Sequence, residues 1–178
     1  MSRTFGRIRQ IGHVVYNLDE ALDRWSKLGI GPFYRYDHLP LDYFRVGGKE
    51  MNIDLSIALG YSGGMQFELI QQHNPEPSPY KDYLDLYGEG VHHLCVWSYD
   101  YDADMARWLA QGYKVALDGQ IGGARFSYFD AASLPGTYME VGDLTLWTGV
   151  MNKMHDEAEA WDGREPVRSM ADLVTSLT

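Results

Sequence analysis

Two histidines and two glutamates occupy matching places in the two halves of this sequence. His13 and His93 each begin a short apolar segment, and Glu68 and Glu140 each follow a glycine at the same short spacing. Two imidazoles and two carboxylates suit a borderline or hard divalent cation such as Zn, Ni, Co, Mn or Fe(II). A single His or Glu on a strand is usually a solvated surface residue. Because both residue types recur, the pattern favours one shared metal site.

Other landmarks repeat along the chain. Arg24-Trp25 is separated from Arg107-Trp108 by the same offset as Gly29 from Gly112, whereas Glu68 and Glu140 lie closer together. The second half is therefore shorter than the first between its helix and its last strand. Such internal repetition indicates duplicated structural units. We expect an α+β fold of two βαβββ modules, over residues 1–78 and 79–148, and a helical C-terminal extension over 149–178.

Hydrophobic periodicity predicts the elements that carry these residues. Alternating or continuous apolar residues of strand length predict strands, here over 8–16, 33–36, 43–46, 53–59, 65–71, 91–97, 126–129 and 137–141. Helical spacing of apolar residues predicts helices, here from residue 18 to 28, over 79–87 and over 102–109. Each predicted histidine ligand thus lies on the first strand of its module, and each glutamate on the last.

Side chains alternate across a strand, so residues two apart share a face. His13 and Glu68 are expected on the face away from the first helix, with His93 and Glu140 placed likewise in the second half. The intervening residues Phe67, Leu69, Met139 and Val141 are expected to pack on the helices. If the modules pair about a pseudo-twofold axis, all four candidate ligands converge in one cleft.

Three segments resemble one family closely. They are Ile11–Ala21, Phe67–Gln71 and Gly88–Leu94, the last with its double histidine. They look like the glyoxalase/bleomycin resistance/dioxygenase (vicinal oxygen chelate) superfamily, and within it most like the methylmalonyl-CoA epimerase branch. The resemblance covers about residues 8 to 145. It implies paired βαβββ modules, a curled sheet around a metal, and a homodimer.

The resemblance also implies a ligand set, which is His13, Glu68, His93 and Glu140. His93 is preferred to His92 because it corresponds to His13. Epimerases of that branch often have Gln at the first carboxylate position, where this chain has Glu68. Two carboxylates are more similar to glyoxalase I, so the substrate class stays open.

A site of this kind supports electrophilic chemistry. A divalent metal that binds two neighbouring substrate oxygens stabilises the negative charge of an enediolate or enolate. A carboxylate then moves a proton at the adjacent carbon. Family analogy makes Glu140 the first candidate for a ligand that doubles as base, with Glu68 second. Gln66, Tyr138 and Trp97 are candidate substrate contacts.

Three classes of function compete. The first is a metal-dependent isomerase or lyase acting on a small, oxygen-chelating substrate, which the many aromatic residues hint is apolar or aromatic. The second is an Fe(II) extradiol-type dioxygenase, whose sites use two histidines and one carboxylate. The third is a metal-free small-molecule binding protein of the drug-resistance type, which needs no ligand set.

Composition bounds the setting. The 178 residues carry a formal net charge of −10, which opposes binding to nucleic acid or to an anionic membrane. There is no apolar run of about 20 residues, the length needed to span a bilayer. A single cysteine, Cys95, agrees with a reducing compartment. The expected setting is cytoplasmic, with a small molecule as the partner.

The remaining candidates rank lower. His92 is expected on the opposite face from His93, and Cys95 is expected to be a buried structural thiol. His38, His73 and His155 lie in loop or tail contexts without metal-ligand spacing. The glycine-rich segment 119–123 lacks the strand–GxGxxG–helix setting of a nucleotide loop, so a mobile loop near the cleft is expected.

Overall fold

A computed structural model describes residues 4–130 and 137–177 of the chain. Its helices are α1 Leu18–Lys27, α2 Pro79–Tyr87, α3 Tyr101–Ala110, α4 Thr148–Glu159 and α5 Met170–Thr175. The strands before residue 75 are β1 Ile8–Val14, β2 Phe33–Tyr36, β3 Leu41–Val46, β4 Lys49–Glu50, β5 Leu55–Ser62 and β6 Met65–Gln72. The later strands are β7 Gly90–Ser98, β8 Val115–Ile121, β9 Ala124–Asp130, β10 Tyr138–Asp143 and β11 Val167–Ser169.

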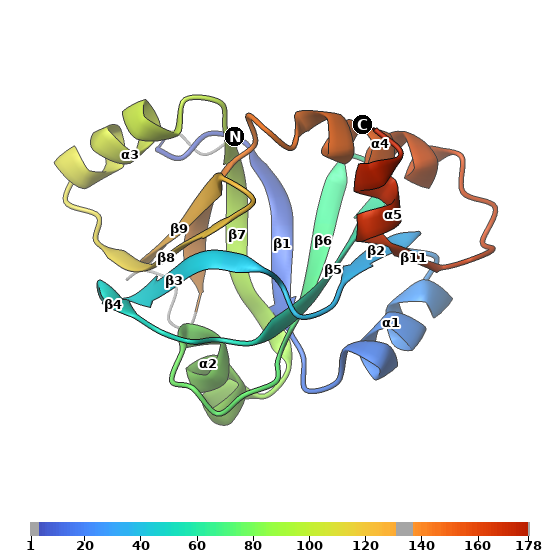
Figure 1. Cartoon of the computed structure of the whole chain (residues 1–178), viewed down its shortest axis with the longest axis horizontal. Helices are drawn as coiled ribbons and strands as arrows, with labels where there is room; N and C mark the ends of the chain where they lie inside the picture. The colour runs from blue at the N-terminus through green and yellow to red at the C-terminus, as the bar shows by residue number, and fades with distance from the viewer. Residues whose placement is uncertain (1–3, 131–136, 178) are drawn as a thin grey trace.

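The described strands form one mixed sheet in the order β11-β2-β5-β6-β1-β7-β10-β9-β8-β3-β4. β1 pairs parallel with β6, and β7 pairs parallel with β10. β1 and β7 pair antiparallel at the centre (Figure 1). The two halves therefore repeat the same βαβββ pairings about the β1–β7 junction, which confirms the predicted fold class.

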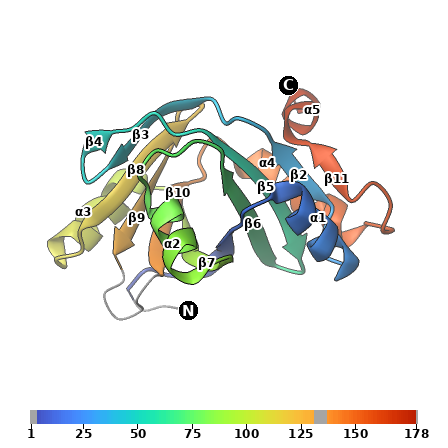
Figure 2. The ribbon, with the colours of Figure 1, turned by 90° about the horizontal axis from the view of Figure 1, so that it is seen from below.

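The two faces of the sheet bury different sets of side chains. On one face, Leu69 packs with Leu18 and Leu22 of α1, while Met139 and Val141 pack with Trp108 of α3. The other face holds a core that includes Val14, Ile70, Tyr80 and Tyr128. Figure 2 shows the sheet curving between α3 at one end and α1 at the other. The predicted packing on the helices is thus confirmed at Leu69, Met139 and Val141.

The sheet is extended at both ends by segments outside the repeated pattern. β3 belongs to the first half of the chain but pairs with β8 of the second half. At the opposite edge, β11 from the C-terminal extension pairs parallel with β2. The extension thus contributes a strand as well as the expected helices. No helix among the described residues is long and apolar enough to cross a membrane.

The expected mobile loop at 119–123 is wrong. Gly119 and Ile121 belong to β8, and Gly122-Gly123 make the tight turn into β9 with φ of 53° and 80°. The ring of Phe126 packs directly on Gly119, where an added Cβ would lie 2.3 Å from its Cζ. The glycines therefore serve a hairpin and a close ring contact. Gly136, which precedes the second glutamate strand, lies outside the described residues.

The C-terminal extension is anchored on this chain. Val150, Met154, Met170 and Leu173 are buried against Tyr34, Leu59 and Tyr61. Glu157 of α4 accepts hydrogen bonds from the hydroxyl of Tyr34 and the guanidinium of Arg168. Burial acts to raise the pKa of Glu157, but the hydrogen bonds from Tyr34 and Lys153 and the charge of Arg168 outweigh it, and the pKa is lowered.

We expect this carboxylate to give a pH-dependent contribution to stability. Because the folded-state pKa is depressed, the contribution is complete above the ordinary pKa of 4.5 and disappears as pH falls through the folded-state value. Glu157→Gln should cost about 1 kcal/mol at neutral pH, after allowance for solvent screening. Urea unfolding of both proteins at several pH values measures the difference. A gap that widened with acidification would contradict the assignment.

Candidate metal site

Three of the four predicted ligands lie together. Glu68 of β6, His93 of β7 and Glu140 of β10 each present a ligand atom, and these atoms lie within 4.8 Å of one another. His93 Nε2 is 3.2 Å from Glu68 Oε2 and 3.0 Å from Glu140 Oε2. The His93 side chain is fully buried, and only 12% and 10% of the Glu68 and Glu140 side chains are exposed. One imidazole and two carboxylates are thus concentrated in an almost dry site.

Strand pairing brings these residues together through Gly12. On one side Gly12 is paired with Glu68 of the parallel β6, and on the other with His93 of the antiparallel β7. The His93 ring lies over Gly12, where an added Cβ would be 1.9 Å from Cε1 and 2.1 Å from Nε2. Position 12 therefore has to lack a side chain for the imidazole to reach the two carboxylates.

Gly12→Ala is expected to disrupt the site and not the fold. The added methyl group would displace the His93 ring from the carboxylates. A misoriented His93 should weaken metal binding by ~10–100-fold, which is the effect seen when the orientation of a ligand is lost. Isothermal titration with Zn²⁺ measures the affinity, and far-UV circular dichroism checks the fold. Ala in place of Gly64, whose Cβ would meet only the end of Arg7 at 3.9 Å, is the matched control. Equal affinities for Gly12→Ala and the unchanged protein would contradict this role.

Burial and neighbouring charges shift the pKa values of His93 and Glu68. Burial acts to lower the pKa of His93, but the carboxylates of Glu140 and Glu68 outweigh burial and raise this pKa to about 9. Burial raises the pKa of Glu68, which the nearby His93 partly offsets. In the absence of a metal the site therefore retains a proton on His93. The two buried carboxylates thus favour a positive charge between them, from a protonated His93 or from a cation.

The donor atoms fit a cation better than they fit each other. His93 Nε2 and Glu140 Oε2 are buried and, within the described residues, neither makes a hydrogen bond of good geometry, although they lie 3.0 Å apart. Buried polar atoms are normally hydrogen-bonded. Nitrogen and oxygen atoms that approach without hydrogen-bond alignment are arranged like ligands around a common centre. The donor set, one nitrogen with carboxylate oxygens, suits Zn, Mn, Fe, Co or Ni.

The structure does not bring His13 to this cluster. Its ring packs against Trp25 at a centroid distance of 4.7 Å and lies 6.4 Å from Phe67, on the face covered by α1. On β1 the residues that share the face of Glu68 are Gly12 and Val14, so His13 points away by one step of the strand alternation. Burial lowers the pKa of His13, so its ring is neutral at pH 7.

Gln10 occupies the place that was expected for His13. Gln10 pairs with Cys95 across β1 and β7, and Gly12 pairs with His93. A twofold axis that relates the two strands would place Gln10 on His93 and Gly12 on Cys95, so Gln10 is the counterpart of His93. The sequence gives the same correspondence, since Gln10 precedes His93 by the offset that separates Arg24 from Arg107, whereas His13 lies closer to His93. That offset was the signal that could have identified Gln10.

The Gln10 side chain is oriented by a short hydrogen-bonded chain. Its Nε2 donates to Gln66 Oε1 at 2.7 Å, and Gln66 Nε2 donates to the hydroxyl of Tyr61 at 3.0 Å. Gln10 Oε1 is buried and has no hydrogen-bond partner among the described residues. An amide oxygen is thus left available beside the cavity that Glu68 and Glu140 also line.

His92 and Cys95 have structural surroundings. A β-bulge between Gly12 and His13 places His92 out of the regular alternation, and both His92 and His93 contact Tyr128. His92 is therefore not on the opposite face as expected, and it is fully buried. Burial raises the pKa of the Cys95 thiol well above its usual value, so the thiol stays protonated. This agrees with a buried structural thiol.

An apolar cavity lies next to the cluster. Gln10, Gln66, Glu68 and Glu140 supply polar groups at its wall. Its apolar lining includes Leu39, Leu41, Ile57, Trp97, Phe126, Leu144, Trp147, Met151 and Met170. Trp147, Met151 and Met170 come from the C-terminal part of the chain, which covers this cavity. Gln66 and Trp97 line the cavity as expected. The Tyr138 ring instead packs on the His92 ring, with their centroids 5.0 Å apart.

The sequence profile described as Glyoxalase/Bleomycin resistance protein/Dioxygenase superfamily matches residues 9–129. No curated protein sequence matches the chain significantly.

Solved structures of methylmalonyl-CoA epimerases share the fold. A Streptomyces coelicolor epimerase variant in complex with 2-nitronate-propionyl-CoA is 21% identical, with a TM-score of 0.55 over 77% of this chain and 96% of its own. The Mycobacterium tuberculosis epimerase is 17% identical, with a TM-score of 0.55 over 80% of this chain and 91% of its own. About a fifth of the present chain thus lies outside the shared fold.

Proposed function

Because the chain belongs to the glyoxalase/bleomycin resistance protein/dioxygenase superfamily, we propose that it is a metal-dependent isomerase or lyase that moves a proton at a carbon next to a carbonyl group. The observation that carries the proposal is the buried convergence of Glu68, His93 and Glu140 beside an apolar cavity. Gln10 Oε1 is the proposed fourth ligand, since it occupies the position related by symmetry to His93.

These four residues would hold one divalent cation. When bound, such a cation stabilises negative charge on two neighbouring oxygens of the substrate. Glu140 would act as the base, because its Oε2 is buried and makes no hydrogen bond within the described residues. A carboxylate in such a position accepts a proton from the substrate carbon and returns it to the same or a neighbouring atom.

The cavity favours a small apolar or aromatic substrate. Its walls expose mainly aliphatic and aromatic side chains. Its polar groups are those at the metal cluster and, separately, Arg125 and Asp143. Small-molecule sites typically combine an apolar lining with a few placed polar groups in this way. Trp147, Met151 and Met170 would set the size of the apolar part, and they come from the part of the chain that follows β10.

Proton exchange with solvent tests the proposal directly. The protein, loaded in turn with Zn, Ni, Co, Mn or Fe(II), is incubated in D₂O with 2-oxoaldehyde–thiol adducts, acyl-CoA esters and catechols. Proton NMR should show deuterium entering the carbon next to the carbonyl of one class, only in the presence of metal. Oxygen consumption with Fe(II) and catechol, or tight ligand binding that is indifferent to metal and gives no exchange, would overturn the proposal in favour of the dioxygenase or the binding protein.

A further inference from the structure

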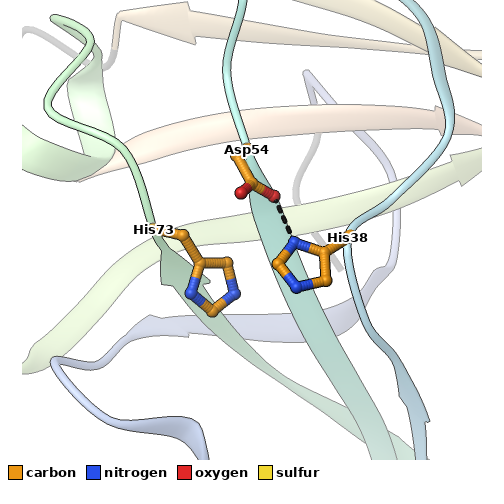
Figure 3. A group of neighbouring side chains, drawn as sticks. All are labelled: His38, Asp54 and His73. Atoms are coloured by element: carbon orange, nitrogen blue, oxygen red, sulfur yellow. Dashed lines mark hydrogen bonds and ion pairs between the residues drawn. The ribbon is translucent and has the colours of Figure 1, made fainter.

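A second group of metal-ligand side chains lies away from the cluster described above. It consists of His38 between β2 and β3, Asp54 just before β5, and His73 just after β6 (Figure 3). Each offers a ligand atom, and these atoms lie within 4.8 Å of one another. We propose that His38, Asp54 and His73 bind a borderline divalent transition metal, with Zn²⁺ as the probe, and that this metal fastens the β2–β3 loop to the end of the β5–β6 hairpin.

Hydrogen bonds of the backbone fix the three segments that carry these side chains relative to one another. The His73 amide donates to the Asp54 carbonyl at 2.8 Å, which continues the β5–β6 pairing by one residue. The Leu39 amide donates to the Leu55 carbonyl at 2.8 Å. The His38 amide donates to Ser56 Oγ at 3.1 Å. Pre-ordered ligands lower the entropic cost of binding.

The side chains already gather as ligands would. His38 Nδ1 and Asp54 Oδ1 are 2.7 Å apart, and the rings of His38 and His73 lie 4.8 Å apart at a tilt of 34°. Figure 3 shows the two rings side by side with the Asp54 carboxylate above them. Bonds of about 2.1 Å to a tetrahedral metal would place ligand atoms about 3.4 Å apart, so small side-chain rotations suffice.

Two further observations support a ligand role. His38 has a positive φ of 48°, which is uncommon for a residue other than glycine, and this backbone turns its side chain toward Asp54. Ser56, which is fully buried, has its Oγ 2.7 Å from His73 Nε2. The other ring nitrogen, His73 Nδ1, lies 3.4 Å from Gln71 Nε2. Metal-bound histidines commonly keep one such bond, through the nitrogen that does not bind the metal, and this bond orients the ring.

The chemistry of the group identifies the class of ion. Two imidazoles and one carboxylate favour Zn, Cu(II), Ni or Co over Mg or Ca, which prefer all-oxygen sites. The side chains of His38 and Asp54 are 67% and 38% exposed, so water would complete the coordination. The chain's net charge of −10 also favours cation binding.

A bound metal here would also affect the cavity wall. Leu39 and Leu55 line the apolar cavity, and they directly follow His38 and Asp54 in the chain. Fixing His38 to Asp54 and His73 would hold Leu39 in place against the cavity. Metal binding by His38, Asp54 and His73 requires no residue of the first cluster.

Zn²⁺ stoichiometry in matched variants tests the inference. Equilibrium dialysis with metal analysis should give two equivalents for the unchanged protein, corresponding to the two groups, and one for the double variant His38→Asn/His73→Asn. His93→Ala should also bind one equivalent, at the second group. His155→Asn, which removes a histidine outside both groups, should still bind two. Circular dichroism checks that each variant is folded.

A spectroscopic readout in the unchanged protein accompanies the dialysis. Long-range ¹H–¹⁵N spectra should show the ring signals of His38 and His73 shifting as Zn²⁺ is added, with those of His155 unmoved. If the double variant retains all the Zn²⁺ and these signals stay in place, the inference fails while the first cluster stands. If His93→Ala retains all the Zn²⁺ and the double variant loses it, the first cluster fails while the inference stands.

Discussion

Replacing Glu140 by glutamine is expected to lower turnover by ~10²-fold or more while leaving metal bound, because the amide keeps an oxygen ligand but cannot accept a proton at neutral pH. Glu140 Oε2 lies 3.0 Å from His93 Nε2, within the group that would hold the cation. Metal analysis and a rate on the substrate found by deuterium exchange measure the two quantities in the same sample.

Glu68→Gln is the matched control for this prediction. Glu68 lies on the other side of His93 at 3.2 Å and is buried to a similar extent. The two variants remove equivalent carboxylates from the two halves of the fold. The loss of rate in Glu68→Gln should be smaller, since the family resemblance assigns proton transfer to the glutamate of the second half. Equal losses would mean that the two carboxylates share the role, and full activity in Glu140→Gln would exclude Glu140 as the base.

Trp108→Ala is expected to cost about 3–5 kcal/mol of unfolding free energy, the range for emptying a buried aromatic site. Trp108 is fully buried between α3 and the sheet. Its ring lies 5.7 Å from Phe129 and 5.3 Å from Phe5, and its Nε1 donates to the Thr4 carbonyl at 3.1 Å. No side chain of the metal cluster lies on this face, so the variant should keep its metal affinity.

The control is the corresponding tryptophan of the first half. Trp25 is only partly buried and packs mainly against Phe67 and His13, so Trp25→Ala should cost less than Trp108→Ala. Urea unfolding with EDTA present compares the two variants without the stabilisation that bound metal adds. If Trp25→Ala lost more unfolding free energy than Trp108→Ala, the assignment of the tighter packing to α3 and not to α1 would be wrong.

The sequence was sufficient for most of the elements, because their signals are local. The helix expected over 79–87 begins at Pro79 after the capping residue Ser78 and ends before Gly88, as observed. The duplicated strand pattern also predicted the pairing that brings Glu68 and Glu140 together. These are consequences of alternation and spacing, which the chain carries within each segment.

The prediction of His13 as a metal ligand is wrong because it places this residue on the wrong face of β1. The sequence comparison pairs His13 with His93 because both are histidines. Their separation is shorter than the separation of the corresponding residues in the two flanking helices, and the difference is an odd number of positions. An odd shift along a strand reverses the face, and His13 consequently points to Trp25. The bulge that places His92 beside His93, and the gathering of His38 with His73, depend on contacts between strands. No local pattern encodes them.

Crystals of the protein soaked with Co²⁺ and measured at the cobalt absorption edge test the central claim most directly. The account predicts an anomalous peak about 2.0–2.3 Å from ligand atoms of Glu68, His93 and Glu140. The next nearest protein oxygen should be Gln10 Oε1, and His13 should remain against Trp25. A metal bound at His13, or no peak between Glu68 and Glu140 when the same crystals bind Co²⁺ elsewhere, would contradict it.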